Sequence, residues 1–132
     1  MSTVMHHFLH PHNCGELESP DGVGIEEDNP WFIRLRLAIK VEDGRIDEIR
    51  FKAAGCLTAV ASMSALTDLV RHRRVDEALA ATPADITCAL QGVPREKVHC
   101  CELAIRVLRR AIWDYEARQD ATNAGGTRTI PQ

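Results

Sequence analysis

The chain has 132 residues, of which 45% are apolar and 27% are charged, a balance typical of one globular domain with its own core. Sixteen basic against nineteen acidic residues give a net charge of −3, which argues against a dedicated nucleic-acid-binding protein. No apolar run approaches the roughly 20 residues of a membrane span, and the first residues lack the pattern of a signal peptide. We therefore expect a cytoplasmic protein with five reduced cysteines and no membrane partner.

The first third of the sequence combines a turn-rich arm with a predicted hairpin. Residues 1–31 are rich in glycine and proline, which predicts a helical turn or loop followed by an irregular arm. Residues 32–41 alternate between apolar and charged side chains, as a half-buried strand does. An Asp-Gly turn and a return strand over residues 46–53 follow, with Ile46 out of phase as expected at a β-bulge.

Helical patterns occupy the rest of the chain. Residues 57–71 carry an apolar stripe at helical spacing. Two short helices are expected over residues 75–81 and 83–90, the second with Thr82 as its N-cap. The longest helix is expected from about residue 94 to residue 118.

The order of these elements predicts an α+β fold. Strands come first and helices second, which favours a small antiparallel sheet of about three strands with helices packed on one face. We expect a single domain over residues 1–118. Residues 119–132 are polar and contain a Gly-Gly pair and a proline, which predicts a flexible tail.

Cysteine and histidine residues are the candidates for chemistry. Cys56 follows a strand at the start of a helix, and His99, Cys100 and Cys101 stand near the start of the longest helix. A helix N-terminus favours the thiolate, the form that binds metal, and cysteine with histidine suits zinc or iron–sulfur chemistry. The spacing alone leaves two interpretations open: a metal site, or two buried thiols beside a surface histidine.

Other cysteines and histidines have simpler interpretations. Cys88 lies in an apolar run and is expected in the core, and Cys14 would reach the site only if the N-terminal arm folded over it. A group of histidines near the start of the chain could bind a metal, although solvated or capping roles are the simpler prediction. This group is His6, His7, His10 and His12.

Residues 7–117 resemble the scaffold proteins of iron–sulfur cluster assembly, the IscU family and the N-terminal domain of NifU. The matching segments, in order, are HPHNCGELESPDGVG, LAIKVEDGRIDEIRFKAAGC, AVASMSALTDLV, VDEALAATPADI and KVHCCELAIRVLRRAIWDY. The resemblance implies the IscU/NifU N-terminal fold. It also implies a scaffold or carrier that binds iron or a transient cluster of the 2Fe-2S type, or zinc in its place, and that is not an enzyme.

The resemblance implies a ligand set for that cluster. Family members hold it with three cysteines, helped by a histidine and an aspartate. Carried over to this sequence, the second cysteine is Cys56, the histidine is His99 and the third cysteine is Cys100. Cys101 replaces a family serine and is a candidate fourth ligand, although its direction on a helix is expected to take it away from Cys56.

Two family positions are altered in this sequence. Phe32 stands where the family has its first cysteine, and Arg34 stands where it has the aspartate. A phenylalanine cannot bind metal, and the fixed positive charge of an arginine disfavours a bare cation but favours thiolates or a net-negative cluster. Three donors remain, so the fourth would come from water, Cys101, a partner protein or the other chain of a homodimer.

Two further functions stay open at this stage. The altered ligand positions suggest a degenerate, scaffold-like module that binds zinc or no metal and regulates a cysteine desulfurase. A Cys–His nucleophile is the other, but the sequence offers no identifiable third residue to orient the histidine.

The resemblance also implies partners. A cysteine desulfurase would supply sulfur, and apo iron–sulfur proteins would accept the cluster. The segment that an Hsp70-type chaperone recognises in the IscU family, Leu-Pro-Pro-Val-Lys, corresponds here to Val93-Pro94-Arg95-Glu96-Lys97. The loss of one proline and of the apolar valine means that the resemblance does not extend to chaperone binding.

Overall fold

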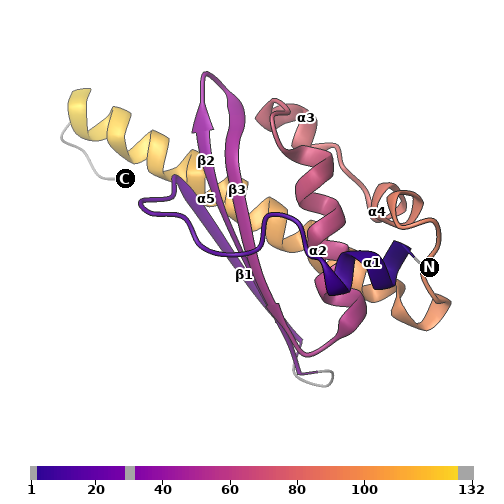
Figure 1. Ribbon diagram of the computed structural model, residues 1–132. Helices are drawn as coiled ribbons and strands as arrows, with labels where there is room; N and C mark the ends of the chain where they lie inside the picture. The colour runs from indigo at the N-terminus through magenta and orange to yellow at the C-terminus, as the bar shows by residue number, and fades with distance from the viewer. Residues whose placement is uncertain (1–2, 29–31, 128–132) are drawn as a thin grey trace.

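The computed structural model describes residues 3–28 and 32–127, with side chains up to residue 121. A three-stranded antiparallel sheet of order β1-β2-β3 carries the long helices α2 and α5 on one face, which confirms the predicted α+β fold (Figure 1). The elements in chain order are α1 (Thr3–Leu9), β1 (Gly22–Asp28), β2 (Ile33–Glu42), β3 (Arg45–Ala54), α2 (Leu57–Val70), α3 (Val75–Leu79), α4 (Pro83–Ala89), the 3-10 turn η2 (Arg95–Lys97) and α5 (Val98–Thr127).

The β2–β3 hairpin follows the predicted pattern. Asp43 and Gly44 have φ angles of 54° and 76°, the two positive values that a tight two-residue hairpin turn requires. The register changes between the pairs Lys40↔Glu48 and Val41↔Ile46, so one residue of β3 has no partner there. This irregularity confirms the bulge expected near Ile46.

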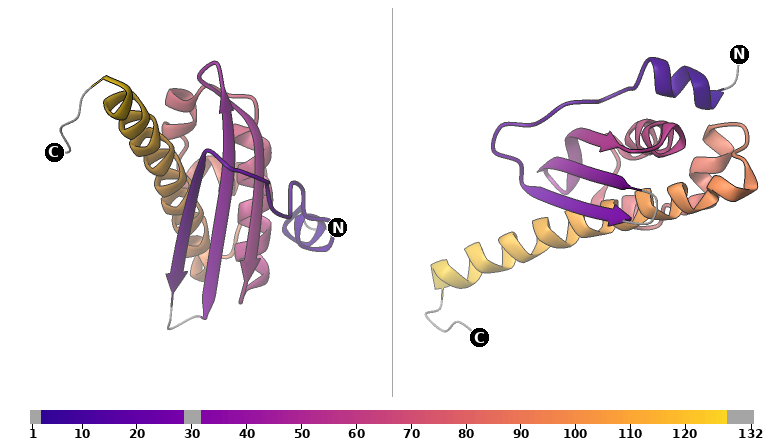
Figure 2. Two further views of the ribbon diagram at one scale, coloured as in Figure 1. Left: turned by 90° about the vertical axis from the view of Figure 1, so that its left-hand side faces the viewer. Right: turned by 90° about the horizontal axis from the view of Figure 1, so that it is seen from below.

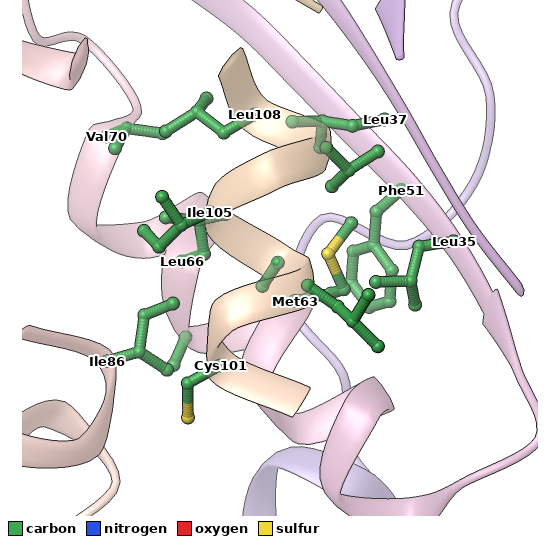
Figure 3. Close-up of a cluster of buried hydrophobic side chains, with 14 of the residues drawn as sticks. Leu35, Leu37, Phe51, Met63, Leu66, Val70, Ile86, Cys101, Ile105 and Leu108 are labelled. Carbon is green, nitrogen blue, oxygen red and sulfur yellow. The ribbon is translucent and has the colours of Figure 1, made fainter. Parts of the chain in front are cut away.

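The core lies between the sheet and the two long helices. Met63 of α2 points toward Leu35 and Phe51 on the inner face of the sheet, and Leu108 of α5 extends toward Val70 of α2 (Figure 3). Burying one such side chain contributes roughly 1.5–3 kcal/mol. The alternation predicted for residues 32–41 is therefore the alternation between this core and the opposite face of the sheet.

The N-terminal segment departs from the expected irregular arm. Residues 22–28 form β1, an edge strand beside β2. Its inward positions include Gly22 and Gly24, which gave no apolar alternation to detect. A Cβ atom on Gly24 would collide with the carbonyl oxygen of Val107 in α5. The glycines thus let α5 pack closely against β1. The same lack of side chains left no apolar pattern in the sequence from which the strand could be predicted.

The rest of the arm covers the other edge of the sheet. The backbone N–H of Gly15 donates to the carbonyl oxygen of Phe51, and the N–H of Phe51 donates to the carbonyl oxygen of Asn13, both at 2.9 Å. This pairing covers part of the open edge of β3. Helix α1 packs on α2 on the side away from α5 (Figure 2).

The C-terminal helix also differs from the expectation. Helix α5 begins at Val98, after the short 3-10 turn, and continues to Thr127 instead of ending near residue 118. Residues 119–121 are exposed, so they lack the apolar periodicity that would have indicated a helix. The part of the expected tail at residues 128–132 lies outside the described residues. No helix in the described part of the chain is long and apolar enough to cross a membrane.

Candidate functional site

Cys56 lies at the junction between β3 and α2. It occupies the N-cap position of α2, directly after Gly55, whose φ of 104° is costly for any other residue. A Cβ atom on Gly55 would collide with the carbonyl oxygen of Phe32. The glycine therefore allows the backbone at position 32 to lie directly against the residue that precedes Cys56.

Cys100 reaches the same place from the first turn of α5. Its side chain is fully buried, and its Sγ lies 3.9 Å from the Sγ of Cys56. Two sulfurs bound to one tetrahedral ion at about 2.3 Å stand about 3.8 Å apart. The fold thus holds two thiols, 44 positions apart in the sequence, at the separation that a shared metal ion requires.

His99 joins this pair from the side of Cys100. Its Nε2 lies 3.8 Å from the Sγ of Cys100. The family resemblance predicted that Cys56, His99 and Cys100 come together. In the structure the Cys56 sulfur and the His99 ring nitrogen both lie within 3.9 Å of the Cys100 sulfur. The two sulfurs and one imidazole form a donor set that suits zinc or an iron–sulfur cluster.

The two thiols differ in their protonation. Partial burial raises the pKa of the Cys56 thiol, but the backbone N–H groups of Ala59 and Thr58, the neighbouring Cys100 thiol and the Lys97 charge outweigh it, so the pKa falls below its usual value. Burial, together with the charge on Cys56, raises the pKa of Cys100 to about 12. The pair therefore consists of an activated sulfur and a protonated one.

Lys97 is a part of the site to which the sequence analysis gave no role. Its Nζ lies 3.8 Å from the Sγ of Cys56. Lys97 is the first residue of the matching segment KVHCCELAIRVLRRAIWDY, so the family resemblance could have indicated its role. Its ammonium stabilises a thiolate, or the negative charge of a bound cluster, and supplies the nearby cation that we had expected from Arg34.

Phe32 and Arg34 are both exposed side chains. The Phe32 side chain is 85% exposed on a backbone with a φ of 55°. The Nε of Arg34 pairs with a carboxylate oxygen of Glu27 on the neighbouring strand at 3.1 Å. Neither side chain is packed into the protein interior, so position 32, where the family has its first cysteine, is open to solvent.

The remaining cysteines lie elsewhere. Cys101 is fully buried next to Ile86, with its Sγ 3.6 Å from the Ser62 hydroxyl and 3.7 Å from the Thr87 hydroxyl, so the structure does not bring it to Cys56 (Figure 3). Cys14 is exposed and lies beside Phe51 of β3, five positions before Cys56 along the chain.

The prediction that Cys88 lies in the core is wrong. It is exposed on α4, whereas Ile86 and Leu90 are the buried residues of this segment. Positions four apart share a helix face, and position 88, halfway between them, points the other way.

Comparisons with known proteins agree on one family. The model of the NifU-like N terminal domain matches residues 1–122. The iron-sulfur cluster assembly scaffold protein IscU 1 of Archaeoglobus fulgidus is 40% identical over 112 residues, which cover 85% of this chain and 73% of the relative. The scaffold protein IscU of Escherichia coli is 36% identical over 122 residues, with 89% and 94% covered.

A solved structure supports the same fold. The N-terminal NifU-like protein from Brucella abortus superposes with a TM-score of 0.75 at 16% identity, covering 88% of this chain and 93% of that one. At this level of identity the likeness concerns the fold alone.

Proposed function

Because the chain belongs to the family of NifU-like N-terminal domains, we propose that it is an iron–sulfur cluster assembly scaffold. The observation that carries this proposal is the pair of sulfurs of Cys56 and Cys100, 3.9 Å apart at the meeting point of two segments distant in sequence. The relatives described above are scaffold proteins by name, and we assign the site a binding role rather than a catalytic one.

The geometry suggests how the cargo is bound. The Cys56 sulfur, with its lowered pKa and its partial exposure, is the first to bind iron or sulfur. Cys100 has to lose its proton on binding, so loading of the site releases a proton and weakens as the pH falls. His99 supplies the third donor, and Lys97 balances the negative charge of the sulfurs.

The missing fourth donor affects how tightly the scaffold holds its cargo. Because Phe32 replaces the family's first cysteine, one position on the cargo stays open to water, to a partner protein or to a second copy of the chain. An open position makes the bound cargo labile, which suits delivery better than storage. We propose a transient 2Fe-2S cluster, with zinc as its substitute in the same donors.

The partners follow from this chemistry. A cluster needs a source of sulfide, for which a cysteine desulfurase is the proposed donor, and apo iron–sulfur proteins are the proposed acceptors. We place these steps in the cytoplasm. The alternative role, a regulatory module without cargo, is less well supported, because its basis was the loss of two ligand positions and the two sulfurs nevertheless lie at binding distance.

A metal and sulfide assay tests the proposal. Protein purified without oxygen is analysed for iron, zinc and acid-labile sulfide, with Cys56→Ala as the test variant and Cys88→Ala as the matched control. We expect comparable amounts of iron and sulfide in the wild type and in Cys88→Ala, and a loss in Cys56→Ala. If the wild type binds neither iron nor sulfide after reconstitution with both, the scaffold function is wrong.

A further inference from the structure

A second group of metal-binding side chains lies between α1 and α2. Four of the six histidines of the chain fall within residues 6–12. We expected solvated or capping roles for them, but His7 is buried, with its Nδ1 2.7 Å from the hydroxyl oxygen of Ser64 in α2. One imidazole of this group is therefore fixed in place by the packing of α1 on α2.

His12 is held at the same place by the loop that follows α1. Its Nδ1 lies 2.5 Å from a carboxylate oxygen of Asp68, and its backbone N–H donates to the Ser64 hydroxyl at 2.8 Å. The side-chain amide of Asn13 donates to the other carboxylate oxygen of Asp68 at 3.2 Å. These bonds orient both His12 and Asp68, although their side chains are 41% and 45% exposed.

We propose that His7, His12 and Asp68 form a metal site for a divalent first-row transition ion such as Zn²⁺, separate from the Cys56–Cys100 site. Within the described residues, each of the three offers a ligand atom, and these atoms all lie within 4.8 Å of one another. Nitrogen and oxygen ligands of one tetrahedral zinc ion stand about 3.3 Å apart, given bonds of roughly 2.0–2.2 Å. Small rotations of the exposed side chains close this difference.

The chemistry of the group fits such an ion. Two imidazoles and a carboxylate are donors that zinc and ferrous iron accept. The ion takes the place of the hydrogen between the Nδ1 of His12 and the Asp68 carboxylate, and the Nε2 of the neutral imidazole then carries the ring hydrogen. His6 lies beside this group, with its ring centroid 5.7 Å from that of His7 and 5.8 Å from that of His12, but its ligand atoms do not belong to the group. Burial and the proximity of His12 lower the pKa of His7, which favours the neutral, ligating imidazole.

Such an ion would join three segments of the chain. His7 comes from α1, His12 from the following loop and Asp68 from the last turn of α2. The site would therefore fasten the N-terminal helix to α2, the helix that Cys56 caps, whether or not a cluster is bound at Cys56.

Zinc binding to a tag-free chain tests this site. The two thiols of the other site are first removed in Cys56→Ser/Cys100→Ser, so that bound Zn²⁺ reports on the histidine site alone. We expect this protein to bind one Zn²⁺ per chain in equilibrium dialysis, and the added change His12→Gln or Asp68→Asn to weaken binding at least about tenfold. His72→Asn is the matched control and should leave binding unchanged, because His72 is exposed, its backbone N–H bonds to the carbonyl oxygen of Ile46 in β3, and it is not a member of the metal-binding group.

Amide hydrogen exchange gives a second measurement. Zn²⁺ should slow exchange in residues 3–9 of the Cys56→Ser/Cys100→Ser protein and have no such effect once Asp68→Asn is added. Absence of Zn²⁺ binding to the Cys56→Ser/Cys100→Ser protein, or equal binding with and without His12 and Asp68, would overturn the proposal. Neither result depends on iron or sulfide, so the scaffold function stands or falls separately.

Discussion

At the scale of single residues, the two sulfurs of the site differ in exposure and in protonation. Cys56 is partly exposed at a helix N-terminus and close to a cation, which favours its thiolate. Cys100 is buried and keeps its proton, with a pKa of about 12. A neutral partner beside a thiolate avoids the repulsion of two like charges until a cation arrives to compensate both.

This difference predicts selective alkylation. Iodoacetamide near neutral pH should modify Cys56 well before Cys100, because Cys56 is both more accessible and more ionised. Lys97→Met should move the pH midpoint of the Cys56 reaction upward, since loss of the positive charge raises its pKa, whereas Arg95→Met in the same turn should not. Mass spectrometry of digested samples measures both rates. Faster modification of Cys100, or equal midpoints for the two variants, would contradict this assignment.

Position 32 should accept a fourth metal ligand. Its backbone touches Gly55, the neighbour of Cys56, and the side chain of Phe32 is exposed and fills nothing. We therefore expect Phe32→Cys to increase Zn²⁺ affinity at the cysteine site by at least about tenfold, because a third thiolate joins the donor set. Phe32→Ser removes the same aromatic ring without adding a thiolate, and it should leave the affinity close to that of the wild type. Competition with a chromophoric chelator measures both.

At the scale of elements, β1 and α5 depend on the absence of side chains. Added Cβ atoms on Gly22 and Gly24 would collide with backbone oxygens of α5, so the strand and the helix lie closer than any other residue allows. This close contact matters for the site, since α5 is the helix whose first turn carries Cys100.

The packing predicts that Gly24→Val destabilises the protein. The new side chain collides with the backbone of α5, and we expect a loss of about 1–3 kcal/mol in the free energy of unfolding. Ile25→Ala is the control on the same strand, because Ile25 is 47% exposed, and it should change stability by no more than about 0.5 kcal/mol. Urea denaturation measures both. A Gly24→Val protein as stable as Ile25→Ala would show that the strand and the helix can move apart freely.

These elements also show what the sequence could predict. Alternating patterns predicted β2 and β3, because each strand turns one face to the core. The spacing of its apolar residues predicted α2, although this helix is buried on more than one face. The strand β1 escaped detection because its inward positions carry glycine. The two cysteines of the site came from a family motif, since spacing cannot show that the end of a strand and the start of a distant helix meet. The role of Lys97 and the contact of His12 with Asp68 needed the fold itself.

At the scale of the whole molecule, the cysteine site joins two halves of the chain. Cys56 belongs to the sheet and α2, and Cys100 to the helix that crosses the sheet from the other end of the sequence (Figure 1). An ion bound to both sulfurs would cross-link these parts in the folded state. Binding to the folded state alone stabilises it by mass action.

Zinc should therefore raise the melting temperature through both cysteines. With free Zn²⁺ at about 100 times its dissociation constant, the gain is about 2.7 kcal/mol, which corresponds to a shift on the order of 10 °C for a chain of this size. Cys100→Ser should lose most of this shift, and Cys88→Ser should keep it, because Cys88 is exposed on another helix. Stabilisation through the histidine group would be common to all three proteins and cancels in the comparison. Equal shifts in Cys100→Ser and the wild type would mean that the two sulfurs do not share an ion.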